Sequence, residues 1–301
     1  MTSWQDPQLD RVAWRVRPSH RTVALSIAVL FAGQALWAQR QKLSPIAAQQ
    51  YVKQVIDKEI AAAANDHSRW MYEDDYRSPE KHVVKLVVQT ADGNLSRTIL
   101  RNGHALTPQE REKDQAKMQA VITDPSVRAK QRRDSAHDDA QSASLMRILP
   151  DAFVWTETGE SKGLMTFHFV PKSSYQPPTY ASRVFAAMAG DMVVNSRQQR
   201  LVSLSGKLIR PVEFGYGIFG KLQQGGTFHI IRSETGPGEW QITEMHVHIE
   251  GHILFFKSIS QQEDEITSHF RPTPPNLQLE QAARQLNDGT IARELGVAMP
   301  Q

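Results

Sequence analysis

Hydrophobic and polar residues alternate along the chain between residues 189 and 260, and turn-forming residues interrupt the alternation at short intervals. Alternation with a period of two is typical of strands with one buried face, and closely spaced Gly, Asn and Pro are typical of hairpin turns. The pattern therefore predicts an antiparallel meander. Its turn signals are Asn195–Gln198, Gly215–Gly220, Gly225-Gly226, Gly236-Pro237-Gly238 and Gly251.

Strands are also predicted earlier in the chain. Residues 82–90 are strongly β-branched, residues 91–94 contain an Asp-Gly turn, and residues 95–101 return, so the sequence predicts a hairpin. Further strands are expected at 68–77, 152–157 and 164–170.

Two segments carry helix-start signals. Ser44 followed by Pro45 predicts an N-cap and first helical position, and apolar residues then recur at helical spacing. This expected buried stripe is Ile46, Tyr51, Val52, Val55, Ile56 and Ile60. Thr107 and Glu110 form a capping-box signature that opens a charged helical insertion, residues 107–149, with a short second helix at 143–149. The insertion has few apolar residues, so it is expected to protrude from the domain.

These elements predict an α+β fold with one large curved antiparallel sheet, an unclosed half-barrel. The N-terminal helix is expected to cover the sheet, and the helical region interrupts it. The expected domain is residues 39–271. Residues 272–301 are expected to be a proline-rich polar C-terminal tail with one marginal helix at 277–286.

The N-terminus predicts export. Four arginines precede a short apolar run at residues 22–33, and small residues follow at Ala35 and Ala38. This arrangement is typical of a signal peptide, residues 1–38, cleaved after Ala38 or alternatively after Ala35. An uncleaved anchor is the other interpretation, although the run is short for a membrane span of about 20 residues. The expected location is the periplasm.

Charge and cysteine content exclude several classes. Residues 1–38 hold four of the 35 basic and two of the 32 acidic residues, so the remaining chain has 31 and 30 and is nearly neutral. A nucleic-acid-binding protein would need a concentrated basic surface, so none is expected. The chain has no cysteine, which excludes disulfides, thiolate metal sites and a bacterial lipoprotein anchor.

A histidine-rich strand is the one metal candidate. On an extended segment, His246, His248 and Glu250 share one face, and two histidines with a carboxylate could hold zinc. The same alternation also fits a solvated polar face opposite buried Met245 and Val247. No cofactor is expected.

No catalytic motif stands in a plausible context. Residues 159–163 match Gly-x-Ser-x-Gly in letters, but they lie between two predicted strands and not at the strand-to-helix elbow that this motif requires. The glycine-rich stretch at residues 214–226 lacks the Gly-Lys-Ser/Thr ending of a phosphate-binding loop. The chain is therefore expected not to be an enzyme.

Aromatic residues gather on the predicted strands, where they could fill a core or line an apolar cavity. The sequence does not separate these alternatives. The candidate cavity-lining residues are Trp70, Tyr72, Phe167, Phe169, Phe214, Phe228, Trp240 and Phe255.

The strand-turn-strand segment from Gly190 to Leu204 resembles that of the LolA/LolB-like superfamily of outer-membrane lipoprotein-sorting proteins, which includes the RseB-type stress sensors. The layout of residues 44–260 is also similar. The resemblance implies an unclosed barrel of about eleven strands with helices over an apolar cavity for acyl chains.

The expected function is a non-enzymatic periplasmic carrier that binds a lipid, a lipidated protein or another apolar ligand, with possible peripheral membrane contact. An envelope protein-interaction module is the second interpretation, and a metal-dependent hydrolase using residues 246–250 is the third.

Overall fold

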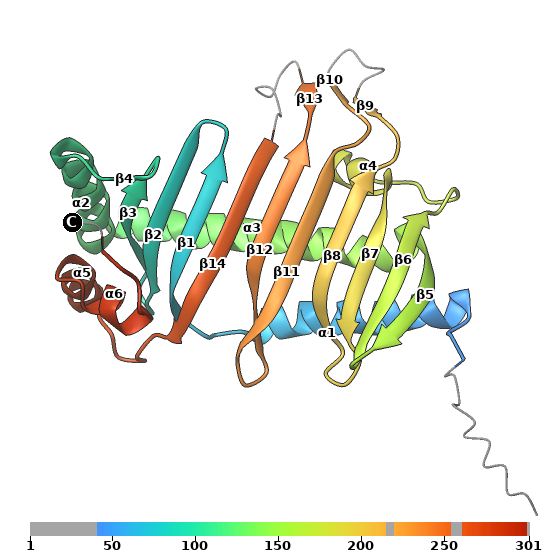
Figure 1. Ribbon diagram of the computed structural model, residues 1–301, viewed down its shortest axis with the longest axis horizontal. Coiled ribbons are helices and arrows are strands. Elements are labelled where there is room, and N and C mark those ends of the chain that lie inside the picture. The colour runs from blue at the N-terminus through green and yellow to red at the C-terminus, as the bar shows by residue number, and fades with distance from the viewer. Residues whose placement is uncertain (1–40, 215–219, 254–260, 300–301) are drawn as a thin grey trace, which may run out of the picture. The chain divides into compact units, whose positions relative to one another are not determined.

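An eleven-stranded antiparallel sheet dominates the computed structural model, which describes residues 41–214, 220–253 and 261–299 (Figure 1). The strand order is β4-β3-β2-β1-β14-β12-β11-β8-β7-β6-β5, so the sheet is open at β4 and β5. The expected α+β fold with an unclosed antiparallel sheet is confirmed. The strands are β1 (Trp70–Ser78), β2 (Lys81–Gln89), β3 (Asn94–Arg101), β4 (His104–Ala105), β5 (Phe153–Ser161), β6 (Leu164–Pro171), β7 (Met188–Asn195), β8 (Arg200–Leu208), β11 (Thr227–Gly236), β12 (Glu239–Ile249) and β14 (Gln261–Pro272).

The glycine-rich part of the predicted meander leaves the main sheet. Three short strands, β9 (Val212–Phe214), β10 (Gly220–Leu222) and β13 (Gly251–Ile253), form a separate small sheet in the order β13-β10-β9. Gly251 needs its lack of a side chain here, because a Cβ would lie 2.7 Å from the Lys221 carbonyl oxygen.

The helices are α1 (Pro45–Asn65), α2 (Pro108–Thr123), α3 (Pro125–Ala152), α4 (Tyr180–Phe185), α5 (Leu279–Asn287) and α6 (Thr290–Leu295). The start of α1 is confirmed, because the Ser44 hydroxyl accepts a hydrogen bond from the Ala47 amide. The expected stripe is partly wrong: Val52, Val55 and Ile56 are buried, but Ile46 is 72% exposed. It precedes the first buried turn of the helix.

The inserted helical region differs from the prediction. The capping box at Thr107 is present, but the helix ends at Thr123, and Asp124 caps a second helix through the Ser126 amide. This helix, α3, continues for 28 residues and carries Pro150 in its last turn. The expected separate helix at 143–149 is therefore part of α3. Instead of protruding, α3 crosses behind the sheet on the same side as α1 (Figure 1).

The C-terminal segment also differs from the expected polar tail. Residues 41–301 form one compact unit, and α5 and α6 are part of its core. Leu279, Leu286, Ile291 and Leu295 are buried there. The polar residues between them face outward, which makes a short amphipathic helix pair look polar in a sequence.

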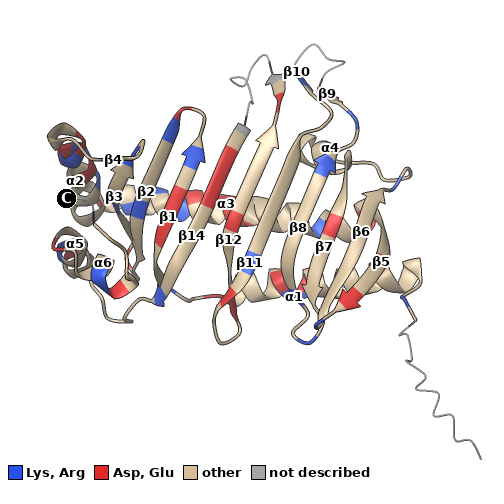
Figure 2. Cartoon of the chain, in the orientation of Figure 1, with Lys and Arg blue, Asp and Glu red and all other residues tan. Residues whose placement is uncertain are grey.

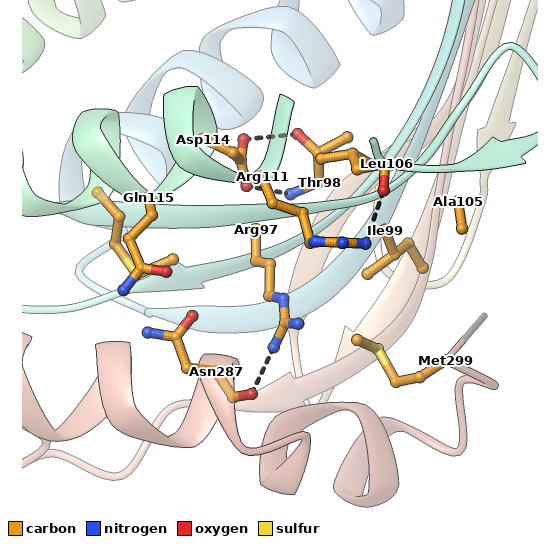
Figure 3. A pocket seen from close by; sticks show the side chains of 11 residues that line it. Arg97, Thr98, Ile99, Ala105, Leu106, Arg111, Asp114, Gln115, Asn287 and Met299 are labelled. Carbon is orange, nitrogen blue, oxygen red and sulfur yellow. Dashed lines mark hydrogen bonds between the residues drawn. The ribbon is translucent and has the colours of Figure 1, made fainter. Parts of the chain in front are cut away.

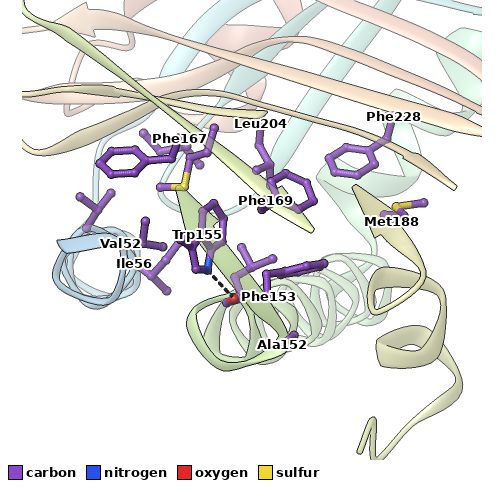
Figure 4. Packing of buried hydrophobic residues seen from close by; sticks show 14 of the residues in the cluster. Val52, Ile56, Ala152, Phe153, Trp155, Phe167, Phe169, Met188, Leu204 and Phe228 are labelled. Carbon is purple, nitrogen blue, oxygen red and sulfur yellow. Dashed lines mark hydrogen bonds between the residues drawn. The ribbon is translucent and has the colours of Figure 1, made fainter. Parts of the chain in front are cut away.

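Two hydrophobic cores lie at opposite ends and on opposite faces of the sheet. The first joins α1 and the end of α3 to strands β5 to β8 and β11 (Figure 4). The second joins α2, α5 and α6 to β1, β2 and β3. The register across β2, β1, β14, β12 and β11 places Val83, Tyr76, Glu265, Met245 and Ile230 on one face. Ile230 packs on the first core, whereas the neighbouring Val84 belongs to the second.

Strand β14 holds the two ends of the sheet together. It pairs with β1 on one side and with β12 on the other, so a segment from near the end of the chain lies in the middle of the sheet. Figure 2 shows acidic positions on β1, β14 and β12 in this central region.

Candidate functional site

The aromatic residues expected to line a cavity lie mainly in packed cores. Phe167, Phe169 and Phe228 are buried in the first core, where Phe169 lies edge-on to Phe153 at 4.7 Å between ring centroids (Figure 4). Trp70 and Trp240 are also buried. The three phenylalanines pack in the first core with α1 and the end of α3, whereas Trp70 lies edge-on to Phe270 and Trp240 lies under the Arg200 guanidinium.

The remaining three expected residues differ. Tyr72 is half-buried and stacks on Phe270 at 5.2 Å between centroids. Phe214 ends β9, but its side chain lies outside the described residues, as does all of Phe255. Among the expected residues whose side chains the structure describes, Tyr72 is thus the one that remains partly exposed on the α1 face of the sheet.

The middle of α3 forms an unsupported strap, which we define as residues 132–142. Every residue of the strap is exposed, although it is three helical turns long. Both ends of α3 are fixed. At one end, Gln131 exchanges two hydrogen bonds with the backbone of Asn94, and at the other Leu149 and Ala152 are buried in the first core. A helix packed on a sheet would bury a stripe along this length.

The central strands on the α1 face carry a mixed strip of side chains. Tyr72, Asp74 and Tyr76 alternate along β1, and Glu265 and Met245 continue the row of Tyr76 across β14 and β12. Next along β12, Ile242 is paired with Arg232, whose guanidinium binds Glu59 of α1, so Ile242 belongs to the same face. Its side chain is 48% exposed.

Asp74 is the most buried charge of this strip. Its Oδ2 atom accepts a hydrogen bond from the Lys85 ammonium at 2.8 Å. Its Oδ1 atom is buried and has no partner within the described residues. Burial of a carboxylate oxygen without a donor is costly, so this atom marks a place where a donor would stabilise the site.

Burial shifts the titration of two neighbours. Burial, and then the charge of Asp74, raises the pKa of Glu265 above its usual value. Burial raises the pKa of Tyr72 to about 12, helped by the charges of Asp74 and Glu265. The Tyr72 phenol is therefore a neutral hydrogen-bond donor at physiological pH, and Glu265 takes up a proton more readily than an exposed glutamate.

The predicted histidine cluster lies on the opposite face of the central strands. Asp264 Oδ1 accepts from His246 Nδ1 at 2.6 Å and lies 3.1 Å from His248 Nε2, while Glu244 lies 3.4 Å from His246 Nε2. The expected third member, Glu250, follows the end of β12 and has no contact with them among the recorded bonds of the described chain.

Asp264 thus takes the place that the sequence prediction gave to Glu250. Hydrogen bonds to Asp264 and Glu244 raise the pKa of His246, whereas the bonds from His246 and His248 outweigh burial and lower the pKa of Asp264. In the described ranges, no group of three His, Asp or Glu side chains is arranged to hold a metal ion.

The acidic residues of β14 were missed as site residues. Residues 261–272 contain only two large apolar side chains, Ile266 and Phe270, so no alternation indicates a central strand. The pairing of β14 between β1 and β12 is a long-range property that local sequence does not encode.

The geometry defines an α+β protein with an open eleven-stranded antiparallel sheet and a helical strap over its central strands. The chain matches no known family model, no curated protein and no solved structure. Among the described helices, none is long and apolar enough to cross a membrane.

Proposed function

We propose that this protein binds an apolar ligand, such as a lipid or the acyl chain of a lipoprotein, between the strap and the central strands. The observation that supports this proposal is the exposure of all residues of the strap, which is clamped at both ends. A helix held over a sheet without burying side chains leaves room for a third body between them.

The α1 face of the central strands carries apolar side chains that could receive such a ligand. Ile242 is 48% exposed, and Met245 and Val247 are half-buried on the same face. Apolar side chains that remain accessible beneath a covering element are typical of ligand grooves, because a ligand replaces the missing packing. At about 25 cal/mol per Å², covering roughly 200 Å² of apolar surface would contribute about 5 kcal/mol.

The mixed strip adds polar groups to the proposed ligand site. Tyr72 offers a neutral hydroxyl, and Asp74 has a buried Oδ1 atom without a donor in the described residues, which a ligand could reach only after a small movement of the surrounding side chains. A ligand with an apolar chain and a hydrogen-bonding head fits this combination, which is the chemistry of a lipid.

We further propose that the protein works in the periplasm as a non-enzymatic carrier. The signal-peptide pattern of residues 1–38, which lie outside the described residues, supports this location. The expected partners are a hydrophobic ligand or a lipidated protein, with peripheral membrane contact and no nucleic acid. The open eleven-stranded sheet is the fold that a LolA/LolB-like carrier would need.

The opposite face supports a second function, an envelope protein-interaction module. His82, Asp75, Asp264, His246 and His248 form bonded histidine–carboxylate groups on this face. Such a surface would recognise a polar partner without a small ligand. Copurification of a protein whose binding is lost in a His246→Ala variant would favour this alternative. A hydrolase using His246, His248 and Glu250 lacks a supporting observation.

Native mass spectrometry of the full chain, purified without detergent from cells that express it, tests the carrier proposal. The expected result is a copurified mass of several hundred daltons that extracts into organic solvent. An Ile242→Glu variant should lose this mass, because a carboxylate in the groove would have to be desolvated. The matched control is Ile266→Glu, since Ile266 is 40% exposed on the opposite face and should leave the ligand bound.

The proposal is wrong if the wild-type chain carries no copurified ligand, or if the Ile242→Glu and Ile266→Glu variants both retain the ligand.

A further inference from the structure

A small pocket lies at the β4–β3 end of the sheet, away from the ligand site proposed above. It has a volume of about 130 Å³ and lies between β3, the start of α2 and the end of α5 (Figure 3). Its walls combine apolar side chains, two arginines and two amides. The lining residues used below are Arg97, Thr98, Arg111, Asp114, Gln115 and Asn287.

Two arginines that enter this pocket are held in place by backbone carbonyls. Arg97 Nη1 donates to the carbonyl oxygens of Leu286 at 2.5 Å and Asn287 at 2.6 Å. Arg111 Nη1 donates to the carbonyl oxygen of Leu106 at 2.7 Å. A guanidinium has five N–H donors, and these bonds use only Nη1. In the part of the chain that the structure describes, Nε and Nη2 of both arginines have no recorded acceptor.

The one carboxylate in the pocket is already occupied. Asp114 Oδ2 accepts from the Thr98 amide at 2.9 Å and Asp114 Oδ1 from the Thr98 hydroxyl at 2.8 Å. Asp114 therefore fixes α2 to β3 and pairs with neither arginine. Two arginines and one aspartate give the pocket lining a net charge of +1. Asp288, just outside the lining, balances part of the Arg97 charge: hydrogen bonds from Thr290, and then the charges of Arg293 and Arg97, lower its pKa.

A structural role explains only part of this arrangement. Arg97 caps the last carbonyls of α5, which is a common use of arginine at a helix end. That role does not require a second guanidinium in the same pocket. Like charges in one cavity repel each other, and an anion between them would turn this repulsion into attraction.

We propose that this pocket binds a phosphate group with one net negative charge. Guanidinium pairs are suited to phosphate, because their N–H groups match its oxygens in pairs. Donors from Gln115 and Asn287 come from other walls of the pocket, which suits a tetrahedral group better than a planar carboxylate. The phosphate is either a free monoanion or the phosphodiester of a lipid headgroup. The inference is independent of the apolar groove, so either can fail alone.

Isothermal titration calorimetry on the full chain tests this proposal with two probes, inorganic phosphate and glycerophosphocholine. The expected result is saturable binding of at least one probe, weakened tenfold or more in an Arg111→Gln variant. Arg284→Gln is the matched control, because it removes the same charge from an exposed position of α5 and should bind like wild type. Binding of glycerophosphocholine alone would identify the diester headgroup, and binding of phosphate alone the free anion.

A folding defect is controlled separately. Arg111 is exposed and makes one backbone bond, so the Arg111→Gln variant should unfold at nearly the wild-type urea concentration. The proposal is wrong if neither probe binds the wild-type protein, or if Arg111→Gln binds both probes with unchanged affinity.

Discussion

Arg200 and Glu59, which are 141 residues apart in the sequence, form a two-point ion pair at 2.9 Å (Nε to Oε1) and 3.2 Å (Nη2 to Oε2). Arg232 also donates to Oε2, and the Leu201 amide donates to Oε1 at 2.7 Å. The Glu59 side chain is almost completely buried. One carboxylate thus joins α1 to both β8 and β11, so α1 is a fixed part of the domain.

Replacing Glu59 by alanine should lower the free energy of unfolding by about 3–5 kcal/mol, because it leaves the buried Arg200 and the mostly buried Arg232 without a counter-charge. Urea denaturation followed by circular dichroism measures this change. The control is Lys53→Ala on the same helix, whose exposed pair with Asp57 should contribute less than about 1 kcal/mol. Equal effects of the two substitutions would contradict the assigned role of Glu59.

Acid should weaken the same contact. Burial alone would raise the pKa of Glu59, but the bonds from Arg200 and Arg232 outweigh it and hold the pKa below its usual value. A carboxylate with a lowered folded-state pKa stabilises the protein above its unfolded pKa of about 4.3, and this contribution is lost as pH falls through the folded pKa. The stability difference between wild type and Glu59→Gln should therefore shrink below about pH 4. A constant difference from pH 7 to pH 3 would be inconsistent with this assignment.

The His246–Asp264 pair should show the complementary dependence. The raised pKa of His246 gives a stabilisation that is complete below about pH 6.5 and is lost as pH rises through the folded value. The lowered pKa of Asp264 gives a stabilisation that is complete above about pH 4 and is lost as pH falls through the folded value. A His246→Gln variant should therefore lose more stability at pH 5.5 than at pH 8.5. The difference between the two losses should stay below about 1 kcal/mol, because both side chains are partly exposed. NMR titration of the imidazole provides the direct measurement, and an unshifted or lowered pKa would contradict it.

A close approach of two strands should make Gly190 intolerant of a side chain. A Cβ at this position would lie 1.9 Å from the Ser205 carbonyl oxygen and 2.7 Å from the Gly206 Cα. Gly190→Ala should therefore force β7 and β8 apart and cost roughly 1–3 kcal/mol or more. Gly159→Ala is the control, since a Cβ there meets nothing within 4 Å and the backbone is not left-handed. Equal unfolding temperatures for the Gly190→Ala and Gly159→Ala variants would contradict this prediction.

Hydrogen exchange should distinguish the strap from the ends of α3. The amides of residues 132–142 should exchange faster than those near Leu149 and Ala152, because only the ends are packed. Bound ligand should slow exchange in the strap and leave α2 unchanged. Uniform protection along α3 without ligand would contradict an unsupported middle.

The parts of the fold that the sequence predicted depend on local signals. The Ser44 and Thr107 caps and the Asp-Gly hairpin are encoded within a few residues, and each lies where it was expected. The Asp124-Pro125 start of α3 carried the same kind of signal and was missed. Long-range pairing has no such signal, so the position of β14 in the sheet could not be predicted.

The candidate site was less predictable for the same reason. His246 and His248 were identified from alternation on one strand, but their partner Asp264 comes from a different one. Phe167 and Phe169 were expected in a cavity or a core, and only the positions of α1 and α3 decide for the core. Arg97 and Arg111 gave no motif at all, because their pocket is assembled from three separate elements.

The central place of β14 makes assembly of the sheet dependent on residues 261–272, which follow all its other strands in the sequence. Until residues 261–272 are available, β1 and β12 each have an unpaired edge, and the two halves of the sheet have no shared strand. Contacts between such distant segments form slowly, because a long loop must close first. A chain emerging from the ribosome therefore cannot complete the sheet until β14 has been synthesised, and a truncation before β14 would leave two half-sheets with unpaired edges that are prone to aggregate.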